Sequence, residues 1–225
     1  MPVSADELFA DFVFNFASNG RLQKQRIAFP LRVNTANGEK ILSRKQWKTD
    51  HLFMRNDFYT LMLNSRKQLT LVNDTSVRTA VVERIDFSHH QVRQYFFDRR
   101  QGLWMLCSIN EQPIQEHPNS SFLAFYEEFA TDSAFQAACI ADEVRFTGPD
   151  PDDDFSQMEG VITPDTWPAF APILPADIIY NIVYGQPVAT DSRVVFMIRG
   201  IANGQELEMT FVRKGNRWKL TSLST

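Results

Sequence analysis

A carboxylate, a phenol and a guanidinium occur close together in the first half of the chain, on two neighbouring runs of β-forming residues. The first run, Val77–Phe87, carries Glu83, and the second, Val92–Asp98, carries Arg93 and Tyr95. Both runs are rich in β-branched and aromatic residues, so we predict an antiparallel pair of strands. Such side chains on one face of a strand pair are able to anchor a polar ligand or to exchange protons with it.

The loop between these strands decides which side chains face each other. We predict a three-residue loop, Ser88–His90, because the flanking segments match later parts of the chain at separations that differ by one residue. Counting back from this loop places Ile85 opposite Arg93 and Glu83 opposite Tyr95. Arg93 is then a diagonal neighbour of Glu83. All three polar side chains would lie on the inner wall of the first half.

Two interpretations of Glu83, Arg93 and Tyr95 remain open at this point. In the first, the cluster is an internal ion pair whose removal would leave a buried charge. In the second, Arg93 and Tyr95 hold an anionic or polar ligand, and Glu83 is the acceptor or base. We name these three residues as candidate ligand-binding residues, and we assign no catalytic residue and no metal ligand.

A run of aspartates resembles the start of a calcium-binding loop. Asp150, Asp152 and Asp154 have the alternating spacing of such ligands. However, Phe155 stands where such a loop needs glycine, and Val161 stands where it needs a bidentate carboxylate. We therefore predict a solvated acidic loop, and we expect no metal or other cofactor.

The histidines and cysteines follow no catalytic or metal-binding pattern. The sequence has no Ser-His-Asp order, no glycine-rich phosphate loop and no Cys/His metal spacing. We predict that the histidines lie in loops or at the surface: His51, His89, His90 and His117. Cys107 and Cys139 occur in apolar patterns and are predicted to be small core residues.

The composition excludes several classes of protein. With 225 residues, 44% of them hydrophobic, the chain is able to bury one large core or two smaller ones. The net charge of −4 gives no footprint for nucleic acid. No apolar run approaches the roughly 20 residues of a membrane span.

The N-terminal residues Met1–Ala5 lack both the basic start and the apolar core of a signal peptide. We expect a periplasmic or cell-surface protein if a leader has been removed, and a cytoplasmic protein if Met1 is the native start.

The chain contains one aromatic segment twice. Residues 9–31 and 122–144 match at a constant separation of 113 positions. The matched residues of the first copy are Phe9, Phe12, Phe16, Asn19, Leu22, Gln23 and Ile27, and those of the second are Phe122, Phe125, Phe129, Asp132, Phe135, Gln136 and Ile140. We therefore predict two domains of similar topology, residues 1–114 and 115–225, joined by the polar segment 112–121.

The helices expected in each half follow from spacing and capping residues. Phenylalanines at i, i+3/i+4 and i+7 predict a first helix, and Asp132 is a good N-cap for a short second one. A third helix is predicted to start at Ser43 in the first half and at Thr163 in the second. Trp47 and Trp167 would each fix the entry of that helix by packing against the residue before its cap.

The rest of each half is predicted to be β-structure. Asn203-Gly204 predicts a two-residue hairpin turn with Arg199 opposite Glu208. This pairing places one apolar set on a single face: Val194, Phe196, Ile198, Leu207, Met209 and Phe211. Apolar residues also continue on the opposite face, which suggests that this face is covered as well.

The order of helix, short helix, strand, third helix and antiparallel strands, ending in G-x-W-x-L, resembles the cystatin-like cone of the nuclear-transport-factor-2-like superfamily. Two such cones with a Phe-rich first helix, Phe135-Gln136 and paired tryptophans resemble an uncharacterised family of exported proteins from gut anaerobes. The resemblance covers essentially the whole chain. It implies an α+β fold of two tandem cones, in each of which helices pack on a curved antiparallel sheet around a pocket.

The resemblance implies a fold and no particular chemistry, because the superfamily contains isomerases, dehydratases and members with no known activity. We expect a non-enzymatic ligand-binding or scaffold protein, whose partner is an unknown small molecule or protein. The alternative is a small-molecule enzyme of the isomerase or dehydratase type that uses the polar cluster in the first cone. Single cones of the superfamily often dimerise through the open sheet face, so we expect a monomer whose halves pack sheet to sheet as a pseudo-dimer.

Overall fold

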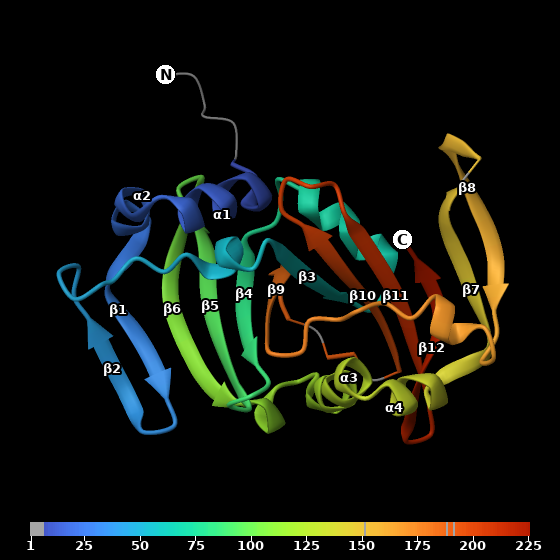
Figure 1. Ribbon diagram of the computed structural model, residues 1–225. Helices are drawn as coiled ribbons and strands as arrows, with labels where there is room; N and C mark the ends of the chain where they lie inside the picture. Colours follow the sequence, from blue (N-terminus) through green and yellow to red (C-terminus); the bar gives the residue numbers. More distant parts are fainter. Residues whose placement is uncertain (1–6, 151, 188, 191) are drawn as a thin grey trace.

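The structure is a computed structural model that describes residues 7–150, 152–187, 189–190 and 192–225 (Figure 1). Residues Met1–Ala5 and the side chains of Asp154 and Phe155, on which the predictions about a leader and an acidic loop partly rest, lie outside the described residues. The α-helices are α1 (Phe9–Ser18), α2 (Gly20–Gln25), α3 (Ser120–Thr131) and α4 (Ser133–Ala138). The 3-10 segments are η1 (Leu52–Arg55), η2 (Arg66–Asn73), η3 (Ile114–Glu116) and η4 (Trp167–Ala169). None of the described helices has the length and apolar character needed to cross a bilayer.

All the strands belong to one curved sheet, which confirms the α+β class. In chain order they are β1 (Ile27–Thr35), β2 (Gly38–Leu42), β3 (Phe58–Leu63), β4 (Thr79–Asp86), β5 (Gln91–Arg100), β6 (Leu103–Pro113), β7 (Ile140–Asp150), β8 (Asp153–Ile162), β9 (Ile178–Tyr184), β10 (Arg193–Gly200), β11 (Glu206–Lys214) and β12 (Arg217–Ser224). Their order across the sheet is β2-β1-β6-β5-β4-β9-β3-β10-β11-β12-β7-β8. The hairpins β1–β2 and β7–β8 therefore form its two edges.

The two halves exchange a strand at the centre of the sheet. β9, from the second half, pairs antiparallel with β4, and β3, from the first half, pairs antiparallel with β10. β3 and β9 meet in parallel, with Thr60 beside Asn181. The halves are thus joined edge to edge by backbone hydrogen bonds. The predicted packing of two separate sheets face to face is wrong.

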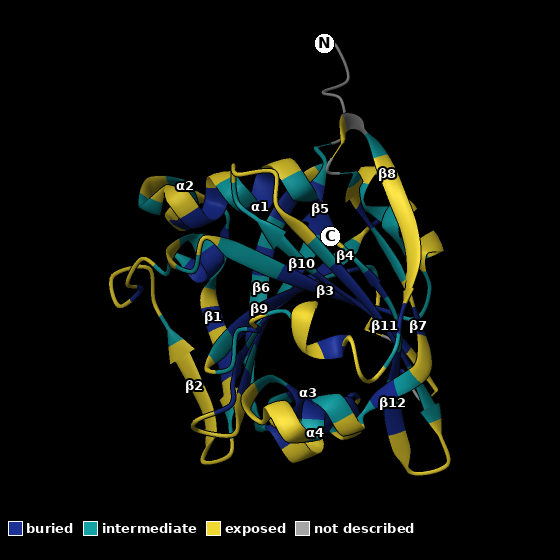
Figure 2. Ribbon diagram, turned by 45° about the vertical axis from the view of Figure 1, so that its right-hand side comes forward, coloured by how far each residue is buried: buried dark blue, intermediate teal, exposed yellow. Residues whose placement is uncertain are grey.

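The central strands contribute side chains to two hydrophobic cores, which lie on opposite faces of the sheet. In β3, Leu61 belongs to the core beneath α1, whereas Met62 belongs to the core beneath α3. In β10, Met197 and Phe196 alternate in the same way. The helix pairs accordingly lie on opposite sides of the sheet, α1 and α2 along the top and α3 and α4 along the bottom (Figures 1 and 2). This explains why apolar residues occupy both faces of these strands.

The aromatic stripe of the first helix is buried as predicted. Phe9, Phe12 and Phe16 of α1 are almost fully buried, and their rings lie 5.3–5.9 Å from the ring of Phe97. Each such phenylalanine contributes roughly 1.5–3 kcal/mol through burial. Asp132 accepts hydrogen bonds from the first backbone N–H groups of α4, so the capping prediction is confirmed.

The predicted third helix is reduced to a single turn in the first half and to a turn followed by the 3-10 segment η4 in the second. The N–H of Trp47 donates to the carbonyl of Ser43, and that of Trp167 donates to the carbonyl of Thr163. Beyond this turn the first-half chain runs without regular structure to η1, because the side chain of Gln23 takes up backbone groups of Asp50 that a helix would have used. Both tryptophans are buried, as the packing prediction required.

The β10–β11 hairpin has a longer loop than predicted. Arg199 faces Glu206 instead of Glu208, and the N–H of Gly200 donates to the carbonyl of Gln205, which encloses residues 201–204. A shift of two residues keeps every side chain on its face. The predicted apolar set therefore still points into one core.

Candidate functional site

The pairing of β4 with β5 separates the three residues that the sequence grouped. Glu83 faces Gln94 instead of Tyr95, because the loop contains four residues, 87–90, and not three. A slip of one residue moves every side chain of a strand to the opposite face of the sheet. Glu83 therefore lies on the side of α3, whereas Arg93 and Tyr95 lie on the side of α1. The predicted single cluster on one wall is wrong.

The carboxylate of Asp86 explains the longer loop. Its Oδ1 accepts hydrogen bonds from the hydroxyl of Ser88 and the backbone N–H of His89, both at 3.0 Å. Its Oδ2 accepts from Arg84 at 2.8 Å. Burial opposes ionisation of Asp86, but the hydrogen bonds from His89, Ser88 and Arg84 outweigh it and lower the pKa to about 2. The loop thus closes around a carboxylate that stays charged.

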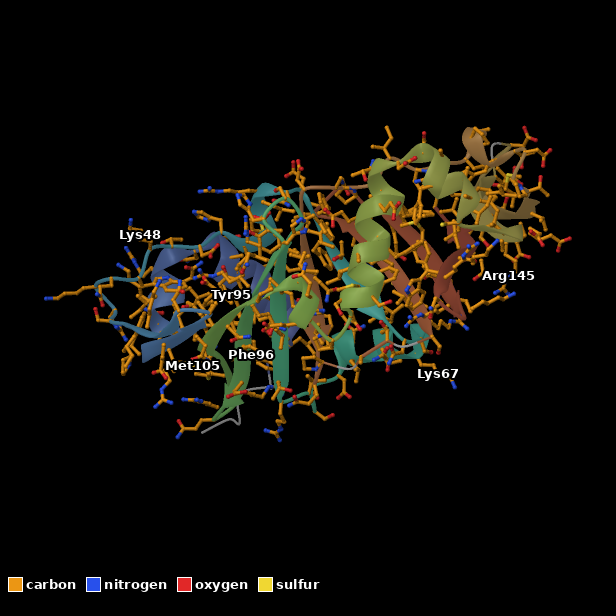
Figure 3. All side chains as sticks on the ribbon, turned by 90° about the horizontal axis from the view of Figure 1, so that it is seen from below. Lys48, Lys67, Tyr95, Phe96, Met105 and Arg145 are labelled. Atoms are coloured by element: carbon orange, nitrogen blue, oxygen red, sulfur yellow. The ribbon has the colours of Figure 1, made fainter. Side chains whose placement is uncertain are left out.

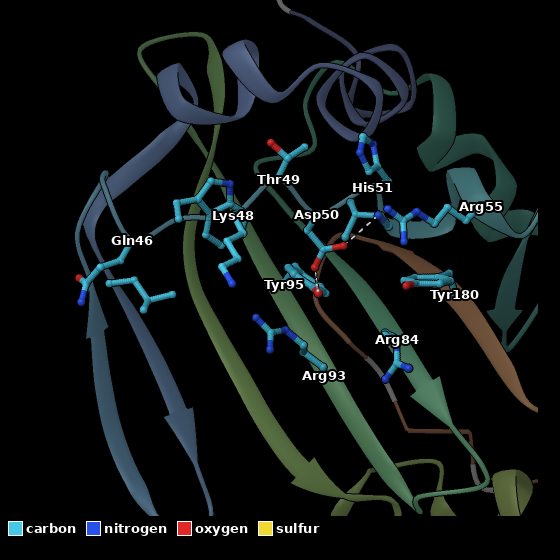
Figure 4. Close-up of a pocket in the computed structure, with 13 residues that line it drawn as sticks. Gln46, Lys48, Thr49, Asp50, His51, Arg55, Arg84, Arg93, Tyr95 and Tyr180 are labelled. Carbon is cyan, nitrogen blue, oxygen red and sulfur yellow. Dashed lines mark hydrogen bonds between the residues drawn. The ribbon is translucent and has the colours of Figure 1, made fainter.

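A cavity of about 490 Å³ opens beside Arg93 and Tyr95 (Figure 4). It lies between the segment 42–55 and the strands β4, β5 and β9. Its lining residues are Leu42, Gln46, Trp47, Lys48, Thr49, Asp50, His51, Leu52, Arg55, Arg84, Arg93, Tyr95 and Tyr180. Tyr180 comes from the second half and reaches this wall only through the exchange of β9.

A buried glutamine holds the segment that carries Asp50. The side-chain amide of Gln23 donates to the carbonyls of Phe16 and Asp50, at 2.9 and 2.6 Å. Its oxygen accepts from the indole N–H of Trp47 and from the backbone N–H of Asp50, at 3.0 and 3.1 Å. Gln23 is fully buried, so these bonds are sheltered from water. They fix the backbone from which the Asp50 side chain enters the cavity.

The side chains of Asp50 and Tyr95 are hydrogen-bonded to each other at the back of the cavity. The Tyr95 hydroxyl donates to Oδ2 of Asp50 at 2.5 Å, and the backbone N–H of Leu52 donates to Oδ1 at 3.0 Å. Burial and the charge of Asp50 raise the pKa of Tyr95 well above its ordinary value, although the guanidinium of Arg93, 5.3 Å above the ring, acts in the opposite direction. Tyr95 therefore stays protonated. It lies in the interior of the first half, whereas Lys48 lies at its outer edge (Figure 3).

The cavity wall is predominantly cationic. Its positive side chains are Lys48, Arg55, Arg84 and Arg93. Arg84 pairs with Asp86 at 2.8 Å and Arg93 with Glu111 at 2.5 Å. Within the described residues, Lys48 and Arg55 form no ion pair. Among the described lining residues Asp50 alone has a carboxylate, and it already accepts hydrogen bonds from two donors.

Glu83 occupies a separate buried cluster behind the sheet. Its carboxylate accepts hydrogen bonds from the side chains of His117, Gln94 and Asn181, at 2.9, 2.9 and 2.8 Å. The backbone N–H of Asn119 donates to Nδ1 of His117, which assigns the imidazole proton to Nε2. Burial opposes ionisation of Glu83, but these donors keep its pKa below the ordinary carboxyl value.

The Glu83 cluster has no room for a ligand. The adjoining void measures about 30 Å³, the share of a single water molecule. His117 lies in the loop between η3 and α3, as predicted, but it is only 4% exposed and therefore does not lie at the surface. Cys107 and Cys139 are half-buried instead of fully buried. Among the described residues, no group of three or more His, Cys, Asp or Glu side chains is placed to hold a metal ion.

The equivalent wall of the second half is apolar. Residues 114 positions further along the chain take the places of the polar wall residues: Ile198 for Arg84, Leu207 for Arg93 and Met209 for Tyr95. The opening there, about 710 Å³, is lined by Leu174, Ile198 and Leu207 among others. The sequence signal that would have given the correct register was this constant separation of 114, applied to both strands.

Sequence reasoning reached only part of the cavity. It selected Arg93 and Tyr95, which lie in the wall, and it selected Glu83, which does not. It missed Asp50, because the helix predicted to start at Ser43 was expected to continue past that residue. It missed Tyr180, because that residue belongs to the other half. Whether Arg93 and Tyr95 bind a ligand stays a prediction.

Comparisons with known proteins agree with the observed fold. The model of a family described as "Domain of unknown function (DUF4348)" matches residues 1–225. Among solved structures, an NTF2-like protein from Bacteroides fragilis NCTC 9343 is similar, with 40% sequence identity and a TM-score of 0.86. The similarity covers 100% of this chain and 98% of that one. No curated protein matches the chain.

Proposed function

Because the chain belongs to the DUF4348 family, for which no function is described, we propose a function from the cavity itself: a non-enzymatic protein that binds a small molecule between Asp50, Arg93 and Tyr180. The volume of about 490 Å³ lies within the range of small-molecule sites. Its polar groups come from rigid strands and from a segment fixed by Gln23, so the site is formed before a ligand arrives.

The state of Asp50 is the observation that favours binding over catalysis. A carboxylate has about four acceptor sites, and a general base works best when the oxygen that faces the substrate is not shared with a protein donor. Oδ1 of Asp50 is bound by the Leu52 N–H and Oδ2 by the Tyr95 hydroxyl. Tyr95 is held in its protonated form. This pair is suited to orienting a ligand by hydrogen bonds and is poorly suited to removing a proton.

Binding is tested by adding a fragment library to ¹⁵N-labelled protein and recording its backbone amide spectrum. We expect molecules that bind to shift the amide resonances of Thr49, Asp50, Tyr95 and Tyr180. We expect the variant Tyr95→Phe to bind these molecules more weakly. Met209→Leu, at the matched position of the second half, is the control and leaves binding unchanged. A library that shifts none of these four resonances contradicts the proposal.

A second candidate function, an isomerase or dehydratase, is favoured by one observation. The Asp50–Tyr95 contact of 2.5 Å places a carboxylate and a phenol together in a cavity, as acid–base chemistry requires. The test is incorporation of solvent deuterium beside the carbonyl of small ketones, followed by proton NMR. Exchange that depends on wild-type protein and is lost in Asp50→Asn would favour the enzyme.

Three properties of the whole chain belong to the proposal: two tandem cones, a monomeric state and export. The symmetric strand order about the β9–β3 junction supports two cones, and their mutual strand exchange supports a single chain as the complete unit. Export to the periplasm or the cell surface is supported by the resemblance to exported proteins. Light scattering at the mass of one chain and fractionation of the native host are the checks.

A further inference from the structure

We propose that the ligand carries an acidic group, a carboxylate or a phosphate, which binds between the guanidinium groups of Arg84 and Arg93 with Lys48 above it. This inference rests on the proposed function, since it names the chemistry of the molecule that occupies the same cavity. It is carried by four observations on the pairing of the two arginines, their donors, the surrounding charge and the shape of the cavity.

The first observation is that two like charges face each other across neighbouring strands. Arg84 of β4 pairs directly with Arg93 of β5, and both side chains line the cavity (Figure 4). Like charges in directly opposite positions of a sheet are destabilising. The fold does not need them, because Ile198 and Leu207 fill the same positions in the second half. An anion placed between the two cations reduces the repulsion that remains after their pairing with Asp86 and Glu111.

The second observation is that the carboxylate partners leave donors available. Asp86 engages one terminal nitrogen of Arg84, and Glu111 engages one terminal nitrogen of Arg93. Nε of Arg93 has no hydrogen-bond partner among the described residues, but it is buried, so the donors that face the cavity are the remaining terminal nitrogens. A guanidinium has five N–H donors in a planar fork that matches carboxylate and phosphate oxygens. Asp86 and Glu111 therefore orient the arginines without using up their capacity to bind.

The third observation is the local excess of positive charge. The lining holds four cations, Lys48, Arg55, Arg84 and Arg93. The carboxylates of Asp50, Asp86 and Glu111 offset three of them. The remaining positive charge lies in a chain whose net charge is −4. A concave site of opposite sign to the rest of the surface concentrates and steers anions.

The fourth observation concerns the rest of the ligand. The cavity of about 490 Å³ is much larger than an inorganic ion, and Leu42, Trp47 and Tyr180 supply apolar surface. The Tyr95 hydroxyl is committed to Asp50. The geometry therefore fits an organic acid or an organic phosphate whose acidic group lies between the arginines and whose body contacts the aromatic side chains.

The test compares three probes with one common ring: benzoate, phenyl phosphate and the neutral benzyl alcohol. Binding is measured by titration of the amide resonances of Asp50, Tyr95 and Tyr180. We expect both anions to bind at least about tenfold more tightly than benzyl alcohol, since hydrogen bonds to charged groups are the stronger ones. The relative affinity of benzoate and phenyl phosphate distinguishes a carboxylate from a phosphate ligand. Added sodium chloride should lower the affinity of the protein for both anions and leave its affinity for benzyl alcohol unchanged.

Variants assign the effect to the two arginines. Arg84→Met and Arg93→Met should each weaken anion binding by about tenfold or more, whereas Arg84→Lys and Arg93→Lys should keep part of it. Arg100→Met is the control, because Arg100 lies on β5 like Arg93 but outside the cavity. It should leave anion binding unchanged. Melting temperatures confirm that each variant is folded.

Two results would overturn this inference. In the first, benzyl alcohol binds the cavity as tightly as the anions, or the methionine variants bind anions like wild type. The acidic ligand is then excluded while small-molecule binding stands. In the second, none of the three probes shifts a cavity resonance. The anion site is then excluded as well, and the proposed function fails with it only if the fragment library also gives no shift.

Discussion

At the scale of single residues, the buried carboxylate of Glu83 depends on its three donors. His117, Gln94 and Asn181 each direct an N–H at it, from the segment before α3, from β5 and from β9. An unpaired charge at this depth would cost several kcal/mol. The cluster therefore stabilises the centre of the sheet, and the wall of the cavity lies on the other face.

Replacing Glu83 with glutamine should destabilise the protein by about 2–4 kcal/mol at pH 7, because an amide N–H₂ would then face donors instead of an acceptor. The folded-state pKa of Glu83 lies below the unfolded value of 4.5. Its stabilising contribution is therefore complete above about pH 4.5 and declines as the pH falls through the folded-state pKa. Urea unfolding of wild type and Glu83→Gln between pH 7 and pH 3 should show the difference shrinking toward acid.

Glu111→Gln is the matched control for that comparison, since Glu111 is one-third exposed. It should cost about 1 kcal/mol or less. Glu83→Gln should leave binding in the cavity unchanged, because Glu83 faces the opposite side of the sheet. Equal stability of Glu83→Gln and wild type at pH 7 would disprove the structural role.

At the scale of elements, the turns that contain Trp47 and Trp167 are held by different numbers of hydrogen bonds in the two halves. In the first half, Gln23 makes four hydrogen bonds that tie α1 and the Trp47 turn to the Asp50 backbone. In the second half, Gln136 donates to the carbonyl of Phe129, but the buried indole nitrogen of Trp167 has no partner among the described residues. The tighter turn belongs to the half that contains the polar cavity.

Gln23→Leu and Gln136→Leu test this difference. At about 1 kcal/mol per hydrogen bond, the first should lose about 4 kcal/mol of unfolding free energy and the second about 1 kcal/mol. Urea denaturation gives both values. Gln23→Leu should also broaden or shift the amide resonance of Asp50, whereas Gln136→Leu should not. Equal losses of stability would show that the hydrogen bonds between Gln23 and the Asp50 backbone contribute nothing to stability.

At the scale of the whole molecule, the exchange of β3 and β9 makes each half incomplete. β4 has β9 as its outer neighbour, and β10 has β3. Val195 and Met197 of the second half lie in the core beneath α1, and Ile85 and Phe87 of the first half lie in the core beneath α3. Neither predicted domain therefore contains its whole core, and the boundary after residue 114 stays a prediction about sequence.

Separate expression of residues 1–114 and 115–225 tests this interdependence. Each fragment alone should lack the near-ultraviolet circular dichroism of packed aromatic rings, because its exchanged strand has no partner. Mixing the fragments should restore that signal, the mass of one complete chain by light scattering, and a single cooperative unfolding transition. Two fragments that each unfold cooperatively on their own would contradict the prediction.

The sequence by itself determined the features that depend on neighbours along the chain. The spacing of Phe9, Phe12 and Phe16 gave the buried face of α1, and Asp132 gave the start of α4. The runs of β-branched residues predicted the strands. The apolar face of the β10–β11 hairpin was predicted correctly although the predicted pairing was shifted by two residues. These features were predictable because local hydrogen bonds and the period of apolar residues decide them.

Only the tertiary structure decided how strands pair across long distances. The loop of Asp86 has one more residue than predicted, which was enough to move Glu83 away from Arg93 and Tyr95. Apart from Thr60 and Asn181, β3 and β9 carry apolar and aromatic residues on both faces, so either fits beside β4 or β10 by the pattern of apolar residues alone. Their exchange brings Tyr180 into the cavity. Arg84 and Tyr180 pair across 180 − 84 = 96 residues, and pairing over such distances is chosen by the free energy of the complete packed sheet and not by any local pattern.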